Sequence, residues 1–150
     1  MPSPGPPRTP AGDVVYNAFG AACPTREILT VISGKWVTLT LIALAGGAVR
    51  YGQLANRIGG VSHKMLTQTL RTLEAHGLVE RTVTPTIPVT VDYSLTELGA
   101  SLVPVVQAIK TWAETNVHRV RAVKSTYEPP PGGGAETAEL VSARLTAAHG

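Results

Sequence analysis

A run of polar side chains between residues 62 and 71 has the composition of a surface that contacts nucleic acid. Six of these side chains can hydrogen-bond to bases or phosphates: Ser62, His63, Lys64, Thr67, Gln68 and Arg71. Glutamine can pair bidentately with adenine, arginine and lysine with guanine or phosphate, and serine or threonine with bases or backbone. No acidic residue occurs from Ser62 to Leu73, as expected of a surface that approaches phosphates.

These polar residues lie on a predicted helix from Ser62 to His76. Ser62 is a good N-cap and Gly77 ends the helix. Helical spacing places one apolar stripe on the core side, formed by Met65, Leu66, Leu70 and Leu73. The polar residues then point outward. A plain solvated helix face would show the same pattern, so the neighbouring elements must decide between the two interpretations.

The residues before this helix predict three further helices. A short one begins at Pro24 and breaks at Ser33 and Gly34, and a second from Lys35 to Ala45 is apolar nearly all round and therefore buried. Ala48 to Tyr51 is a brief extended segment. A third helix from Gln53 to Ile58 is joined to the polar helix by the turn at residues 59–61.

The residues after the polar helix predict a β-hairpin and a long helix. Strands from Leu78 to Thr84 and from Val89 to Leu95 are joined by a Pro-bounded loop. Thr96 caps a helix that continues to about Val123. Helix, turn, helix and hairpin in this order predict an α+β, mainly α fold: a winged helix-turn-helix domain with an N-terminal segment and a long C-terminal dimerisation helix.

Six short segments between Cys23 and Trp112 form a recognisable combination: Cys23-Pro24, Gly34-Lys35-Trp36, Arg50-Tyr51 with Leu54, Val61 to Leu70 (VSHKMLTQTL), Gly77 to Arg81 (GLVER) and Val91 to Gly99 (VDYSLTELG). With these segments the chain closely resembles the HxlR-type winged helix-turn-helix regulators, which are near the MarR group. The resemblance implies a sequence-specific DNA-binding transcriptional regulator. The alternative is a winged-helix module that binds protein and does not read DNA.

The same resemblance implies a homodimer on a near-palindromic operator of double-stranded DNA. The N-terminal segment and the long C-terminal helix would form the dimer and place two recognition helices in successive major grooves. The long helix also carries more apolar surface than a small domain can cover, which favours a partner. The candidate interface residues are Leu102, Val105, Val106, Ile109 and Trp112. The alternative is that Trp112 only covers the core.

Three basic residues outside the polar helix are candidate phosphate contacts: Lys35, Arg50 and Arg81. Each could equally be an ordinary surface charge. The hairpin departs from the family pattern, because members often carry a basic residue near the start of the second strand, where this chain has Thr86, Ile87, Val89 and Thr90. Minor-groove contacts by the hairpin are therefore in doubt.

Cys23 has two interpretations. Several family members resemble thiol switches that respond to oxidants or electrophiles, and the positive end of a helix dipole beside Pro24 would favour a reactive thiolate. Alternatively, Cys23 is a packing residue, and the chain has no second cysteine to resolve a sulfenic acid. A small-molecule effector could bind among the aromatic side chains, which we expect instead to be core: Tyr16, Phe19, Trp36 and Tyr93.

Composition limits the remaining function classes. Eleven basic against six acidic residues between Arg26 and Lys124 give that segment a net charge of +5, within a chain of +3. One cysteine and scattered histidines predict no metal site and no cofactor, and no catalytic motif indicates an enzyme. We expect a cytoplasmic protein without a membrane segment. The predicted domains are a disordered tail over 1–13, the winged helix-turn-helix domain over 14–127, and a Pro/Gly-rich linker with a short tail over 128–150.

Overall fold

The helix-turn-helix is formed by α3 (Tyr51–Arg57) and α4 (His63–Ala75), as predicted. The computed structural model describes residues 16–131, so the tail predicted for 1–13 and the C-terminal tail beyond residue 131 lie outside the described residues. The turn between the helices needs Gly60, whose φ of 81° favours glycine. The Ser62 hydroxyl then accepts a hydrogen bond from the Met65 amide at 3.1 Å, which confirms the predicted N-cap.

Two helices precede this pair, α1 (Thr25–Ile32) and α2 (Lys35–Ala43). α2 crosses the centre of the domain and packs on α4, with Leu41 fully buried. α1 has no buried residue of its own. α2 is therefore a core element, whereas α1 lies on the surface of the domain.

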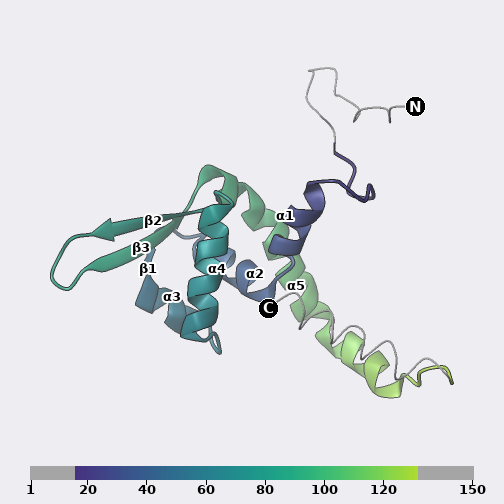
Figure 1. Ribbon diagram of the computed structural model, residues 1–150. Coiled ribbons are helices and arrows are strands. Elements are labelled where there is room, and N and C mark those ends of the chain that lie inside the picture. The colour runs from purple at the N-terminus through teal and green to yellow at the C-terminus, as the bar shows by residue number, and fades with distance from the viewer. Residues whose placement is uncertain (1–15, 132–150) are drawn as a thin grey trace, which may run out of the picture. The chain divides into compact units, whose positions relative to one another are not determined.

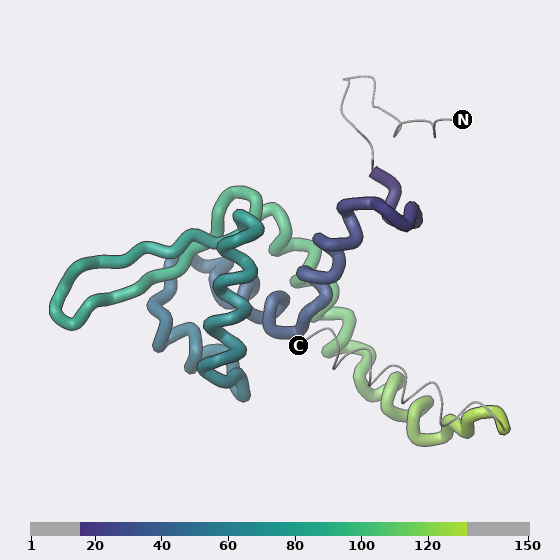
Figure 2. The backbone as a smooth tube through the Cα atoms, in the orientation of Figure 1, coloured from purple at the N-terminus to yellow at the C-terminus, as the bar shows by residue number. Residues whose placement is uncertain are grey.

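A small antiparallel sheet completes the winged domain. Its strand order is β1 (Val49–Arg50), β3 (Thr90–Leu95), β2 (Val79–Thr84). β2 and β3 pair over six residues each, from Val79 opposite Leu95 to Thr84 opposite Thr90. Figures 1 and 2 show the β2–β3 hairpin extending beyond α3 and α4, with α4 beside the base of the hairpin. The hairpin is the predicted wing.

The core of the winged domain lies between α2, α3, α4 and the sheet. Its most buried apolar side chains are Leu41, Leu44, Leu54, Leu66, Leu70, Leu73 and Val106. α4 contributes three of these leucines, as its apolar spacing predicted. Met65 was expected on the same stripe, but 36% of its surface is exposed. It lies one position before Leu66 in the first turn, where the helix surface already rotates away from the core.

The long helix α5 runs from Glu97 to Thr126, slightly further than predicted. The Thr96 hydroxyl caps it by accepting from the Gly99 amide at 3.0 Å, and donates to the Gly77 carbonyl at 2.6 Å. The chain divides into two compact units after Thr111, so the winged domain and the C-terminal half of α5 are described separately. Within residues 16–131, none of the helices combines the length and apolar character needed to cross a membrane.

Candidate nucleic-acid interface

The outward face of α4 is open to solvent along its length. His63, Lys64, Gln68 and Arg71 are exposed, and Thr67 is half-buried between them. These five side chains line one shallow hollow on the surface. The sixth predicted contact residue, Ser62, is exposed but uses its hydroxyl to cap the helix. Among residues 16–131, no element packs over the face predicted to read DNA.

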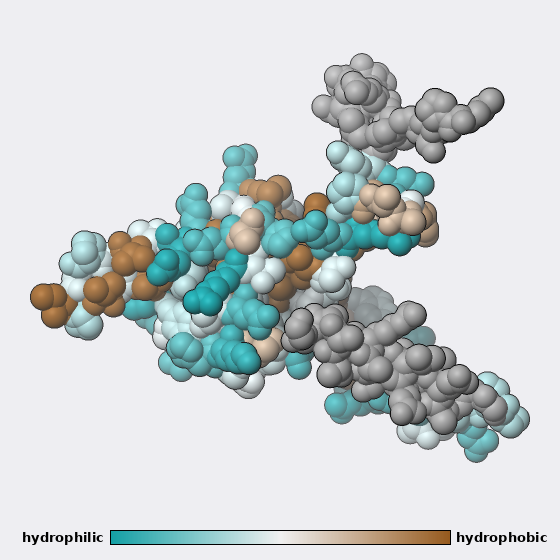
Figure 3. Space-filling model, in the orientation of Figure 1, coloured by the Kyte–Doolittle hydropathy of each residue, from teal (hydrophilic) through white to brown (hydrophobic). Residues whose placement is uncertain are grey.

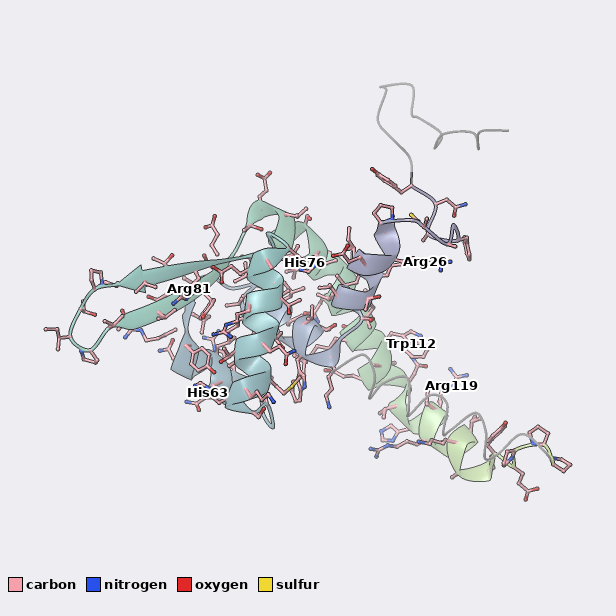
Figure 4. All side chains as sticks on the ribbon, in the orientation of Figure 1. Arg26, His63, His76, Arg81, Trp112 and Arg119 are labelled. Carbon is pink, nitrogen blue, oxygen red and sulfur yellow. The ribbon has the colours of Figure 1, made fainter. Side chains whose placement is uncertain are left out.

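A second hollow joins this face to the hairpin. It shares His63 and Thr67 with the first and extends to Arg50, Arg81 and the stretch from Pro88 to Val91. Figure 4 shows His63 at the N-terminal end of α4 and Arg81 on the hairpin beside it. α4 and the hairpin therefore present one continuous surface, which we call the basic groove: the lining of these two hollows.

Tyr51 fixes the first turns of α4 against the rest of this surface. Its hydroxyl donates to the His63 carbonyl at 3.2 Å. The hydroxyl oxygen of Thr67 lies 3.1 Å from the hydroxyl oxygen of Tyr51, within hydrogen-bonding distance. Its ring lies 5.1 Å from the His63 ring and 6.4 Å from that of Tyr93, between centroids. One side chain at the start of α3 thereby sets the position of α4 relative to the sheet.

Tyr93 connects the sheet to the basic residue of the wing. It is 8% exposed on the central strand, directly opposite Arg81 in the ladder. Burial raises the pKa of Tyr93, and the adjacent Arg81 guanidinium opposes the rise because it favours the phenolate. Sequence reasoning assigned no role at this site to Tyr51 or Tyr93. Two signals pointed to them: both belong to segments that carry the family resemblance, and each is next to or within a strand that borders the helix-turn-helix.

The three other predicted phosphate contacts differ in their placement. Arg50 and Arg81 both line the basic groove, and Arg50 pairs with Asp92 at 3.6 Å across β1 and β3. Asp92 therefore offsets part of the positive charge of Arg50. Lys35 lines neither hollow among those found in the described residues; its ammonium lies 4.6 Å from the centre of the Trp36 ring. The structure does not bring Lys35 together with the other candidates.

The candidate interface residues of α5 fall into two groups. Val105, Ile109 and Trp112 are 51%, 54% and 62% exposed. Leu102 packs partly on the core. Val106 is 1% exposed and belongs to the core of the winged domain, so it cannot contact a second copy in this conformation. The prediction that Val106 belongs to the dimer interface is therefore corrected. Adjacent helix positions point about 100° apart, so Val106 packs in the core while Val105 faces solvent.

Cys23 has a free, partly exposed thiol and lies one residue before Pro24, the N-cap of α1. The loop that precedes it is held by Arg26, which donates to the Ala18 and Phe19 carbonyls at 2.8 and 3.0 Å. The expectation that all four aromatic residues are core is wrong for Phe19 and Tyr16, which are 93% and 57% exposed. Within residues 16–131, no cluster of three or more metal-binding side chains occurs.

A helix-turn-helix whose second helix has an exposed polar face, joined by one groove to a hairpin wing, is the arrangement of winged helix-turn-helix transcriptional regulators. The chain belongs to the HxlR-like helix-turn-helix family, whose pattern matches residues 31–121. Members of this family are regulators and not enzymes. The resemblance seen in the sequence is confirmed.

Individual relatives agree with this assignment. The HTH-type transcriptional regulator YtfH of Escherichia coli is 43% identical over 108 residues, covering 72% of this chain and 86% of YtfH. The structure of a transcriptional regulator YtfH from Salmonella typhimurium superposes with a TM-score of 0.69 at 40% identity, covering 74% of this chain and 99% of that one. The oxidized form of the redox regulator HypR superposes with a TM-score of 0.58 at 39% identity, covering 63% and 97%.

Proposed function

We propose that this regulator binds a near-palindromic operator as a homodimer, with α4 of each copy in the major groove. The observation that supports this is the basic groove. It combines the exposed side chains of α4 between His63 and Arg71, a stretch without acidic residues, with Arg81 on the adjoining hairpin. Lys64, Gln68 and Arg71 would read base edges or hold phosphates, and Arg50 and Arg81 would hold the backbone on either side.

Dimerisation would use the exposed apolar side chains of α5. Val105, Ile109 and Trp112 follow one another at intervals of four and three residues and are all more than half exposed. Residues at such intervals form one stripe on a helix, and a stripe of this kind usually meets a partner. Ile28 and Leu29 on α1 are similarly exposed and belong to the same proposal. Two copies would double the positive field presented to DNA.

The proposal is tested by removing the reading side chains one at a time. Arg71→Ala and Gln68→Ala are each expected to weaken binding by about 1 to 3 kcal/mol, because each removes a bidentate contact. The probe is duplex DNA that the purified full chain selects from a random-sequence pool, and affinity is measured by fluorescence anisotropy. Arg57→Gln is the matched control, since Arg57 lines a different hollow with Leu39 and Ile42. Equal affinities for all three variants would remove α4 from the readout.

The protein-binding alternative predicts a different response to salt. Each phosphate contact releases counterions, so DNA affinity should fall with a log-log slope of about −0.9 per phosphate neutralised. The same anisotropy titrations, repeated at increasing salt, give this slope. A flat slope, or no selected duplex, would favour the protein-interaction module.

The regulator would also respond to oxidants through Cys23. Support comes from the partial exposure of its thiol and from the 39% identical neighbour, which is itself a redox regulator. The two Cys23 thiols of the dimer would be oxidised by one hydrogen peroxide to one intersubunit disulfide. The peroxide is reduced to two water molecules, which take up the two thiol protons. Oxidised wild type should run as a covalent dimer with altered DNA affinity. Cys23→Ser should do neither, and unchanged affinity of the oxidised wild type would refute the switch.

A further inference from the structure

The tip of the β2–β3 hairpin is apolar and fully open to solvent. Ile87 is 103% exposed, and Val89, which directly precedes β3, is 62% exposed. Figure 3 shows hydrophobic side chains gathered at this end of the hairpin. Exposure of apolar side chains to water does not stabilise a protein, whereas their burial against a partner is favourable. An exposed apolar tip of this kind therefore indicates a site that contacts another molecule.

The tip is also held in one shape. Thr86 donates its hydroxyl to the Pro88 carbonyl at 2.9 Å and its amide to the Thr84 carbonyl at 2.8 Å. Pro85 and Pro88 restrict the backbone on both sides of the exposed isoleucine. Little conformational freedom is left to lose when the tip enters a binding site, which favours insertion over loose surface contact.

The chemistry of the tip differs from that of the surface it extends. No ionisable side chain occurs from residue 82 to residue 91, so the tip cannot hold phosphates by charge. Yet Pro88 and Val89 line the same hollow as Arg50 and Arg81. A ligand that fills the basic groove would therefore contact basic side chains at one end and apolar side chains at the other. A DNA duplex offers matching surfaces: charged phosphates on its outside and stacked bases inside its grooves.

We propose that Ile87 and Pro88 enter the minor groove next to the α4 contact and act as an apolar wedge that partly unstacks one base step. The inference rests on the proposed DNA binding and specifies how the wing takes part in it. Apolar wedges of isoleucine, leucine or proline kink duplexes in this way, and the cost is lowest at flexible pyrimidine–purine steps. The wing would thereby select sequence without hydrogen-bonding to a base.

A protein partner fits the tip less well. A stable protein interface buries about 800 Å² on each side, whereas the apolar tip comprises only a few side chains. Its continuity with the basic side chains of Arg50 and Arg81 also matches a polyanion that has an apolar interior. Stacked bases between phosphate backbones have that combination.

The test uses the full chain and the duplex it selects from a random-sequence pool, with 2-aminopurine substituted at one flanking position at a time. Unstacking at the wedge should raise the fluorescence of 2-aminopurine at a single step outside the α4 contact. Ile87→Ser should abolish this rise and weaken binding about tenfold. Ile87→Leu should retain both. Ile87→Lys should bind with a steeper salt dependence, because it adds a phosphate contact, but without the fluorescence rise.

The outcomes separate the wedge from the proposed function. If Arg71→Ala weakens binding while Ile87→Ser leaves affinity and fluorescence at wild-type values, DNA binding stands and the wedge is wrong. If wild type selects no duplex, both are wrong. Equal melting temperatures of wild type and Ile87→Ser establish that a loss reflects the tip and not the fold, as expected for a side chain without buried surface.

Discussion

Gly99 is the position where a single methyl group should most disturb the arrangement of wing and long helix. It is buried in the first turn of α5. A Cβ at this position would overlap the carbonyl oxygen of Leu78 and lie 2.9 Å from its carbonyl carbon. That oxygen already accepts a hydrogen bond from the Thr96 amide at 3.1 Å. Gly99→Ala must therefore displace backbone, because the atoms nearest to the added Cβ are all backbone atoms of Leu78.

The size of the effect follows from opposing contributions. Forced overpacking costs about 1 to 3 kcal/mol, and weakening the Thr96–Leu78 hydrogen bond costs about 1 kcal/mol more. The higher helix propensity of alanine returns about 0.5 to 1 kcal/mol. We expect a net loss of about 2 kcal/mol in the free energy of unfolding, a large share of the 5 to 15 kcal/mol typical of such domains.

Gly52→Ala is the matched control. Gly52 lies within α3, and a Cβ there meets no atom within 4 Å, so the same substitution should stabilise by about 0.5 to 1 kcal/mol. Urea unfolding followed by circular dichroism, at one fixed protein concentration, measures both changes. Wild-type stability of Gly99→Ala would refute the close packing of α5 on Leu78. Destabilisation by Gly52→Ala would refute the argument that a methyl group is tolerated where it meets no neighbouring atom.

Three further outcomes are expected. Ser62→Ala should lower the free energy of unfolding by about 1 kcal/mol in urea titrations, because the Met65 amide loses its cap; no loss would mean that water replaces the hydroxyl. Tyr51→Phe should cost about 1 kcal/mol in the same titrations and also weaken operator binding in anisotropy, since α4 loses its link at His63 and Thr67; an unchanged affinity would show that the link does not position α4. Burial raises the pKa of Tyr93, so the folded state retains the phenol proton more tightly than the unfolded state. Its stabilising contribution is complete below the ordinary pKa of about 10 and is lost as the pH rises towards the folded-state value; stability measured across that range should depend less steeply on pH in Tyr93→Phe.

Local patterns predicted most of the helix-turn-helix and the wing. The helix caps Ser62 and Thr96 depend on contacts within a few residues, and so does the alternation of apolar and polar residues that predicted the two strands. These signals can therefore be read directly from the sequence. Tertiary contacts decided the rest. Val105 and Val106 are indistinguishable in type, and only the packing of α5 on the domain selects Val106 for the core. The position of Tyr51 between α4 and the sheet depends on long-range contacts that no spacing rule contains.

Local signals also could not foresee that Phe19 is exposed, because its environment is set by the loop that Arg26 holds. Large apolar residues are usually buried, but this tendency says nothing about a particular loop. The placement of Lys35 beside Trp36 has the same origin: charge and sequence position alone do not tell whether a lysine lies near a distant helix.

The two sides of α4 are independent of each other. Leu66, Leu70 and Leu73 hold the helix in the core, and Tyr51 holds its first turns from the side. None of these anchors involves the side chains of Lys64, Gln68 or Arg71. Those three positions could therefore be exchanged for other residues, in a laboratory library or over evolutionary time, with little effect on folding. One scaffold could in this way supply regulators for many different promoters.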